Sequence, residues 1–189
     1  MSVERVIVGV SGASGAILAV RIVERLLELP VEVHLVVSPA AERTLKHEVG
    51  PDALARLETM AHQVHDFSNV GASIASGSFN TAGMIVAPCS MSSLAAIANG
   101  FAGNLLIRSA DVQLKERRRL VLLPREAPLH LGHLRNLCTV VELGAIILPP
   151  VPAFYHRPRS MAEAVDHIAS KAIDLVGLPV PAQTPEWQG

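Results

Sequence analysis

The sequence is poor in aromatic and charged residues. Of its 189 residues, 3% are aromatic and 17% are charged, whereas 50% belong to the hydrophobic set. This hydrophobic content excludes intrinsic disorder, and the scarcity of aromatic rings means that the core has to be built from aliphatic side chains and alanine. Because charges are so few, part of the surface is too apolar to face water alone, and we expect a homo-oligomer.

Cysteines and long hydrophobic runs are also scarce. Cys89 and Cys138 lie far apart and neither belongs to a CxxC pair, which excludes a disulfide framework and a zinc module. No apolar run approaches the roughly 18 to 20 residues of a membrane-spanning helix. The first residues lack a signal-peptide cleavage pattern. We therefore expect a cytoplasmic protein with no membrane span.

The chain has no excess of charge of either sign. Its 16 basic and 17 acidic residues give a formal net charge of -1. This balance excludes a dominant interaction with the backbone of nucleic acid, but it leaves room for a local basic pocket that holds a small phosphate. The one dense basic cluster, residues 115–119, is either a solvated helix end or part of such a pocket.

Short aliphatic runs alternate with segments of helical period along the chain. The pattern predicts strands at 6–10, 31–37, 84–87, 120–123 and 145–148. It predicts helices at 16–29, from residue 39, and at 52–64, 90–99, 105–118, 129–143 and 160–176. Buried strands separated by helices indicate an α/β fold, a doubly wound parallel sheet in three layers. We expect a single domain at 1–178, followed by a more loosely held tail at 179–189.

In a doubly wound sheet, ligands bind where the strands end and the loops lead into helices. Five segments satisfy this rule, and they are rich in Gly, Ser, Arg and Pro. They are residues 11–15, 38–39, 88–93, 124–128 and 149–159. We expect all five to lie along one edge of the sheet, with a composition that suits a ligand carrying a phosphate.

Two of these loops have the same design. Residues 9–15, GVSGASG, space their glycines by three, unlike a GxGxxG fingerprint or a phosphate-binding P-loop. The amides and the Ser14 hydroxyl fit an anion, and the alternative is a tight turn without a ligand. In residues 88–93, three hydroxyls precede a helix: Ser90, Ser92 and Ser93. Capping accounts for one of them, so the pattern favours contact with a phosphate or a ribityl chain.

The remaining polar candidates are Arg125 and Glu126, which directly follow the fourth predicted strand. They are either an anion clamp with an acid/base group or a surface ion pair, and the neighbouring loops favour the site. His62 and His65, like His130 and His133, are spaced i, i+3 without a third ligand, which is typical of polar-face histidines. We expect no metal.

Together, several segments resemble the UbiX flavin prenyltransferase family of the flavodoxin-like flavoprotein superfamily. The resemblance covers essentially the whole chain. It rests on VGVSGASGA at 8–16, PCSM at 88–91, ADV at 110–112 with LKERR at 114–118, RE at 125–126 with PL at 128–129, PPVPAFYHRP at 149–158 and EWQG at 186–189.

The resemblance implies a Rossmann-like or flavodoxin-like enzyme that joins a dimethylallyl group from dimethylallyl monophosphate to reduced FMN. The group would join the central ring nitrogen of the flavin and then the adjacent benzene-ring carbon, closing a fourth ring. The prenylated FMN would serve UbiD-type decarboxylases, in ubiquinone biosynthesis or aromatic-acid metabolism. The family also implies a metal-independent reaction and a homododecamer.

The resemblance further assigns residues to roles. FMN would be contacted by Gly12, Ala13, Ser14, Ser38, Ser90, Met91, Ser92, Ser93 and Arg125. The donor phosphate would be bound by Tyr155 and Lys171, supported by Lys115 and Arg108. Glu126 would transfer protons to the departing phosphate and in ring closure, with Ser14 as a second catalytic residue. Trp187, together with Phe79, would wall the prenyl pocket.

The chain departs from the family pattern at two places. Many members have Met-Lys-Thr where this chain has Met91-Ser92-Ser93, which removes a positive charge near the flavin, and Thr where this chain has Ala127. Two alternatives remain. One is an FMN-dependent cysteine decarboxylase of the same superfamily, which would need a histidine near the first helix. The other is a non-catalytic flavin carrier, in which Glu126 would have no role.

Overall fold

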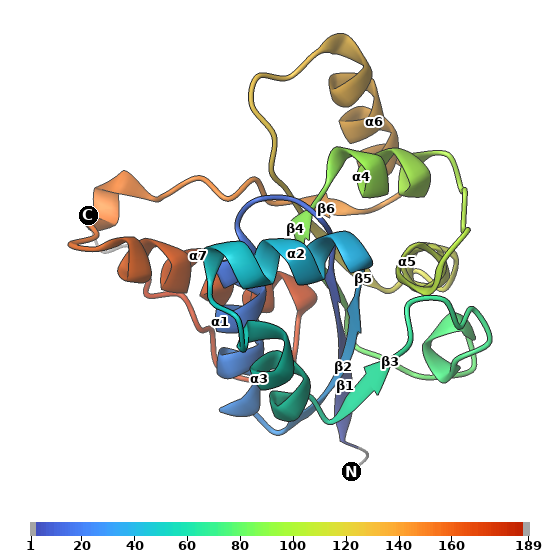
Figure 1. Cartoon of the computed structure of the whole chain (residues 1–189), viewed down its shortest axis with the longest axis horizontal. Helices are drawn as coiled ribbons and strands as arrows, with labels where there is room; N and C mark the ends of the chain where they lie inside the picture. The colour runs from blue at the N-terminus through green and yellow to red at the C-terminus, as the bar shows by residue number, and fades with distance from the viewer. Residues whose placement is uncertain (1–2, 187–189) are drawn as a thin grey trace.

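A computed structural model of the chain describes residues 3–186, which form one six-stranded parallel sheet between two layers of helices (Figure 1). The strand order is β3-β2-β1-β4-β5-β6. The strands are β1 (Glu4–Val10), β2 (Val31–Val37), β3 (Gln63–His65), β4 (Gly83–Cys89), β5 (Arg119–Pro124) and β6 (Ile146–Ile147). The predicted α/β fold with a doubly wound parallel sheet is confirmed.

The chain winds outward from the centre of the sheet in both directions. β1 pairs with β2 on one side, with Val8 opposite Leu35, and with β4 on the other, with Val8 opposite Ile85. The strand order therefore reverses between β1 and β4, and the loops that leave these two strands diverge there. In sheets of this type, that divergence opens the crevice in which ligands bind.

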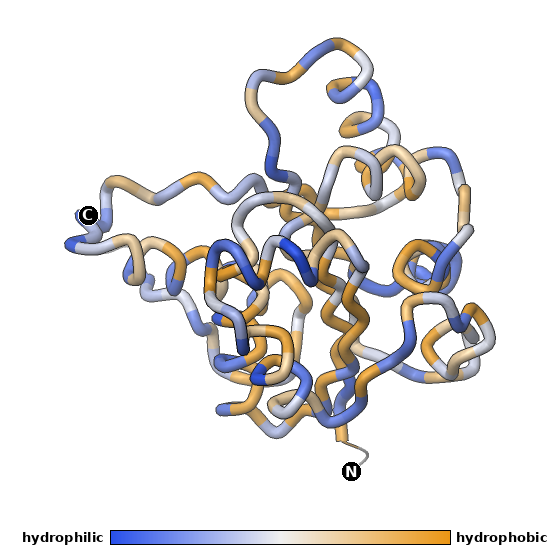
Figure 2. Tube along the Cα trace, viewed as in Figure 1, coloured by the Kyte–Doolittle hydropathy of each residue, from blue (hydrophilic) through white to orange (hydrophobic). Residues whose placement is uncertain are grey.

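The helices divide the hydrophobic residues into two cores. The helices are α1 (Ala16–Leu27), α2 (Pro39–Glu48), α3 (Ala53–Met60), α4 (Met91–Ala98), α5 (Leu105–Lys115), α6 (Leu131–Glu142) and α7 (Met161–Val176). α1, α2, α3 and α7 cover one face, and α4, α5 and α6 cover the other. Figure 2 shows the hydrophobic colouring concentrated along the central strands. As expected from the composition, both cores consist mainly of Val, Leu, Ile and Ala.

One edge strand was not expected from the sequence. The helical pattern predicted for 52–64 ends at Met60, and residues 63–65 form β3. The His62 amide donates to the Val33 carbonyl, and the Val33 amide donates to His62 Nδ1. These bonds satisfy the open edge of β2, so tertiary pairing overrides the local helical pattern.

The tail after α7 is more firmly attached than the sequence suggests. The amides of Gln183 and Thr184 both donate to the Asp174 carboxylate of α7. Pro and Gln content alone indicates a loose segment, but this carboxylate fastens the described part of the tail to the helix. None of the helices within residues 3–186 is long and apolar enough to cross a membrane.

Candidate active site

One serine joins the loops that leave β1 and β4, at the divergence called the crevice below. The Ser11 amide and hydroxyl both donate to the Pro88 carbonyl, at 3.2 and 2.9 Å. The same hydroxyl accepts from the Ser90 amide at 2.7 Å. The Ser38 amide donates to the Val10 carbonyl, which attaches the loop after β2 to the end of β1. Two of the five predicted segments, 11–15 and 88–93, are therefore joined directly, and a third, 38–39, is attached to the strand that leads into the first.

The amides at the end of the first loop already bind an anion, which is the carboxylate of Glu48 from the same chain. α1 begins after Gly15, which has a left-handed conformation (φ 106°) and supplies no side-chain cap. The Glu48 carboxylate at the end of α2 accepts from the Gly15 and Ala16 amides at 2.8 and 2.9 Å. Glu48 thus occupies the positive end of α1, and of the amides predicted to hold the anion of a ligand, the Gly15 amide is already bonded within the chain.

Glu48 also links the first loop to the loop after β5. Partial burial would raise the pKa of the Glu48 carboxyl. Hydrogen bonds from the Ser14 hydroxyl and from the Ala16 and Gly15 amides, together with the charge of Arg125, bring this pKa below its ordinary value. Glu48 therefore stays ionised and orients the Ser14 hydroxyl, and Arg125 lies on the same side of the crevice. Sequence reasoning missed Glu48.

The other serine loops serve partly as helix caps. Ser38 Oγ accepts from the Ala41 amide at 3.2 Å. Ser90 Oγ accepts from the Ser93 amide at 3.1 Å and donates to Ser93 Oγ at 3.0 Å. Ser92 is exposed, and Met91 packs against the core beneath α4. Capping therefore engages one hydroxyl of the 88–93 loop, that of Ser90, as predicted. The Ser93 hydroxyl accepts a hydrogen bond from the cap, and Ser92 is exposed.

Arg125 and Glu126 stand at the end of β5, next to this loop. The Arg125 amide donates to the Cys89 carbonyl at 3.2 Å, and Glu126 Oε1 accepts from the Ala127 amide at 3.1 Å. Residues 125–130 are exposed. Within residues 3–186 no ion pair joins the Arg125 and Glu126 side chains, so the structure does not support a simple surface pair.

Tyr155 and Lys171 lie apart from the crevice. Tyr155 belongs to the short helix η2 (Phe154–His156) and is 58% exposed, with its ring 4.4 Å from that of His156. Figure 1 shows this segment extending away from the loops that end β1 and β4. Lys171 is exposed on α7, beside a hollow of ≈ 320 Å³ that Asp174 and Thr184 also line.

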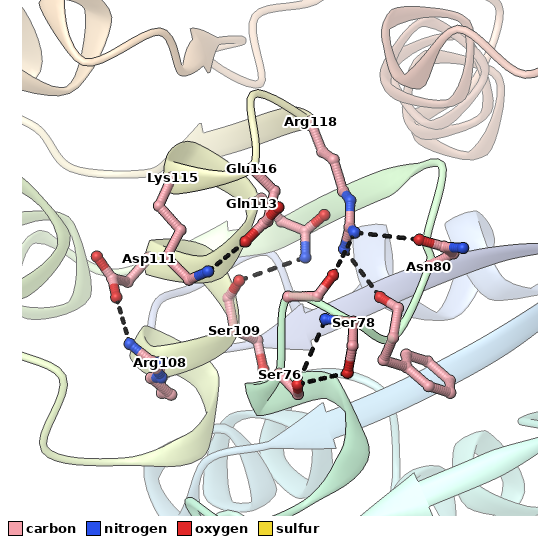
Figure 3. Close-up of polar contacts among 12 residues, drawn as sticks. Ser76, Ser78, Asn80, Arg108, Ser109, Asp111, Gln113, Lys115, Glu116 and Arg118 are labelled. Atoms are coloured by element: carbon pink, nitrogen blue, oxygen red, sulfur yellow. Dashed lines mark hydrogen bonds and ion pairs between the residues drawn. The ribbon is translucent and has the colours of Figure 1, made fainter.

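Lys115 and Arg108 lie on α5 (Figure 3). α5 runs back across the sheet toward the start of β5, so Lys115, its last residue, is at the edge opposite the crevice. Arg108 pairs with Asp111 at 2.7 Å, and Lys115 pairs with Glu116. One copy of the chain does not bring Lys115 to the crevice.

Two further expectations change at this opposite edge. Arg118 is not simply solvated, because its guanidinium donates to the Phe79 carbonyl at 2.8 Å and the Gly77 carbonyl at 2.6 Å (Figure 3). The Phe79 ring packs edge-on against His34 and lies under the Arg5 guanidinium. Phe79 therefore walls no pocket at the crevice of its own chain. Trp187 lies outside the described residues.

The histidine pairs and the cysteines complete the inventory of reactive groups. His65 belongs to β3 rather than to a helix, whereas His130 and His133 stand at the start of α6. Within residues 3–186, no group of three or more His, Cys, Asp or Glu is placed to hold a metal ion. Burial raises the pKa of the Cys89 thiol to about 12, so this thiol is not an activated nucleophile.

Comparisons with known proteins identify close relatives. The family model described as Flavoprotein matches residues 1–176. Flavin prenyltransferase UbiX of Thauera aromatica is 53% identical over 176 residues, covering 93% of this chain and 90% of the relative.

Solved structures agree with the sequence comparison. AnUbiX (PadA1) in complex with FMN and dimethylallyl pyrophosphate has a TM-score of 0.95 at 44% identity, covering 100% of this chain and 99% of the other. A dodecameric FMN-dependent UbiX-like decarboxylase from Escherichia coli O157:H7 has a TM-score of 0.92 at 43% identity, covering 98% and 100%. The cysteine decarboxylase TvaF, at 15% identity and a TM-score of 0.64, covers 93% and 99% and shares the fold alone.

Proposed function

We propose, from the premise that this chain belongs to the UbiX family of flavin prenyltransferases, that it transfers a dimethylallyl group from dimethylallyl monophosphate to reduced FMN. The observation that carries the proposal is the meeting of Ser14, Glu48 and Arg125 at the point where the strand order reverses. A hydroxyl, a carboxylate and a cation there suit a ligand that has both a polar ring and a phosphate.

The small residues of the loops fit the flavin. A Cβ at Gly12 would lie 2.3 Å from Cβ of Ala40, so the first loop packs directly on α2 and leaves its other side for a flat ring. We propose that the flavin is contacted by Gly12, Ala13, Ser14, Ser38, Ser90, Met91, Ser92, Ser93 and Arg125. Reduced FMN, when bound, supplies the nucleophilic ring atoms that take up the dimethylallyl group.

Ser14 is oriented for this contact by Glu48. Because the Ser14 hydroxyl donates its proton to the Glu48 carboxylate, its lone pairs remain free to accept a hydrogen bond from the reduced flavin. Glu48 would thus fix the direction of the Ser14 dipole, a form of electrostatic preorganisation. We propose Ser14 as a catalytic residue and Glu48 as the residue that positions it.

Glu126 would carry the proton transfers. As the bond between the allylic carbon and the phosphate oxygen breaks, negative charge develops on the phosphate, and a nearby acid and several cations stabilise it. Exposed at the end of β5, Glu126 is accessible to such a phosphate. It would protonate the departing phosphate and accept the ring proton that is released when the second bond forms.

The donor phosphate site would be completed by other copies of the chain. Tyr155 and Lys171 lie away from the crevice in one copy, and Lys115 lies at the opposite edge. If all three contact the donor phosphate with Glu126, different copies have to supply them. The exposed apolar side chains, among them Phe101, Leu131 and Phe154, provide surface for such an assembly. We propose a homododecamer, as in the UbiX-like relative from E. coli.

The product and its destination are part of the proposal. Prenylated FMN would pass to a UbiD-type decarboxylase in the cytoplasm. The relative AnUbiX was solved with the pyrophosphate form of the donor, so both donors belong in the assay. We propose that side-chain cations, rather than a metal ion, hold the donor phosphate, and that the tail at 179–189 contributes Trp187 to the prenyl pocket.

Anaerobic incubation with reduced FMN and either donor tests the reaction. The expected product is a flavin heavier by one prenyl group in mass spectra. Glu126→Gln should bind FMN with unchanged affinity and form little product, whereas Glu142→Gln, at the far end of α6, serves as the matched control. Unmodified flavin from a folded, FMN-loaded wild-type chain would refute the proposal. Full activity of Glu126→Gln would instead indicate that Glu126 takes no part.

A further inference from the structure

The segment that carries Glu126 is an exposed arm fixed mainly at its two ends. It leaves β5 where the Arg125 amide donates to the Cys89 carbonyl, and it enters α6 at His130. Figure 1 shows the arm and α6 projecting beyond the body of the sheet. Val140 is the one residue of α6 that is buried, and the helix packs on the body near its end, whereas its start at Leu131 is exposed. The cap at His130 therefore fixes the end of the arm, and with it the position of Glu126.

His130 caps α6 through a ring nitrogen. Its Nδ1 accepts from the Gly132 amide at 3.0 Å and from the His133 amide at 3.4 Å. A Cβ at position 132 would lie 2.9 Å from Cε1 of this ring, so glycine leaves the space that the ring occupies. Two residues therefore make the cap possible: His130 supplies the acceptor nitrogen, and Gly132 leaves space for the ring.

Unlike the other side-chain caps, this one depends on protonation. α2, α4, α5 and α7 are capped by Ser38, Ser90, Asn104 and Ser160, whose side chains do not titrate. An imidazole accepts at Nδ1 only when the ring is neutral. A proton on Nδ1 would oppose two amide N–H groups and add a positive charge at the positive end of the helix.

The group that faces the His130 ring is the ring of His133. The His133 ring stacks on it at 3.6 Å between centroids, and His133 Nδ1 is buried without a partner among the described residues. The elements packed against α6 are α4 and β6, and neither carries a titratable side chain. The charged groups of the arm itself are Arg125 and Glu126. A second imidazole is therefore the titratable group that faces His130.

We propose that His130 is a positioning residue for the prenyl transfer, whose neutral ring caps α6 and fixes the arm that presents Glu126. The inference rests on the role proposed for Glu126. A proton on Nδ1 would remove the acceptor of both capping hydrogen bonds, and would therefore release the start of α6. Protonation of this ring would thus lower turnover by displacing the arm, even while Glu126 itself is intact.

Variants at position 130 test this proposal through kcat and KM measured from pH 5.5 to 8. Asparagine is a strong N-cap that does not titrate, so His130→Asn should keep the wild-type kcat at pH 8 and lose much of the fall in kcat toward acid. His130→Ala should lower kcat about fivefold at pH 8, the ratio expected for a lost cap, with the KM for FMN unchanged, and its deficit relative to the wild type should shrink toward acid. Gly132→Ala should do the same by displacing the ring.

His62→Asn is the matched control, because His62 Nδ1 also accepts a backbone amide, from Val33, at a place remote from Glu126. His62→Asn should leave the fall in kcat toward acid unchanged. A second readout needs no activity: ¹⁵N spectra of histidine-labelled protein should show His130 with Nδ1 unprotonated at pH 8.

The outcomes separate the two hypotheses. A wild-type chain that makes no prenylated flavin refutes the proposed function. If the wild type is active, the positioning role is refuted when His130→Asn shows the same fall in kcat toward acid as the wild type. It is also refuted when His130→Ala keeps the full kcat. A His130 ring that carries its proton on Nδ1 at pH 8 refutes it as well.

Discussion

Replacing His34 with glutamine is expected to make the stability of the fold less sensitive to acid. His34 is 7% exposed and lies on β2, with Nδ1 3.0 Å from Nε2 of His65 on β3. The Phe79 ring packs edge-on against it at 5.1 Å. Burial, and then the neighbouring His65, lower the pKa of His34 from 6.5 to about 4, outweighing the opposite effect of Glu32.

The sign and size of the effect follow from this pKa. The unfolded chain binds a proton at His34 below about pH 6.5, whereas the folded chain resists it until about pH 4. Stability is therefore complete above pH 6.5 and is lost as the pH falls from 6.5 to 4. A shift of this size corresponds to about 3 kcal/mol in total, of which about 2 kcal/mol is already lost at pH 5.

The assay is urea unfolding at pH 7.5 and pH 5.0 at one fixed protomer concentration, because assembly also contributes to apparent stability. The wild type should lose about 2 kcal/mol more than His34→Gln between the two pH values. His47→Asn, which removes an exposed histidine of α2, should retain the wild-type loss. Equal losses in the wild type and in His34→Gln would refute the argument that burial excludes the proton from His34.

Three further substitutions test separate contacts. Gly12→Ala places a Cβ 2.3 Å from that of Ala40 and should cost about 1 to 3 kcal/mol in urea unfolding and weaken FMN binding, whereas Gly71→Ala should do neither. Arg118→Met leaves two loop carbonyls without their donor and should cost about 1 to 2 kcal/mol. Asp166→Asn breaks the pairs between α1 and α7 and should cost about 1 kcal/mol at pH 7. Because hydrogen bonds from Arg25 help to lower the pKa of Asp166, that cost should shrink as the pH falls through this pKa.

Local patterns predicted the sheet well where the strands are buried on both faces. β2 was predicted at its observed bounds because a β-branched run is enclosed between Pro30 and Ser38. β3 was missed because its three residues have too little sequence to show a period, and they become a strand through hydrogen bonds to β2. The edges of a sheet depend on tertiary pairing, which a local pattern does not contain.

The same distinction applies to the candidate site. The rule that ligands bind at the ends of parallel strands placed Ser11 and Ser90 at one edge, and the structure joins them directly. It did not show that Lys115 would stand at the opposite edge, because a motif match gives a residue type and a position in the chain but not the copy of the chain that uses it. Motifs shared with a family therefore predict the residue types of a site, and the proposed homododecamer is what would bring Lys115 to it.

Glu48 was missed for a different reason, and a local signal for it exists. Its partners, the amides of Gly15 and Ala16, precede it by more than thirty residues, so no short motif contains both sides. Yet Glu48 is the last residue of α2, where the negative end of the helix disfavours a carboxylate. A carboxylate kept at an unfavourable helix end indicates a partner elsewhere, and here that partner is the positive end of α1. The energetic conflict within α2 is resolved only by the tertiary structure, and it is resolved beside Ser14, whose hydroxyl bonds to the same carboxylate.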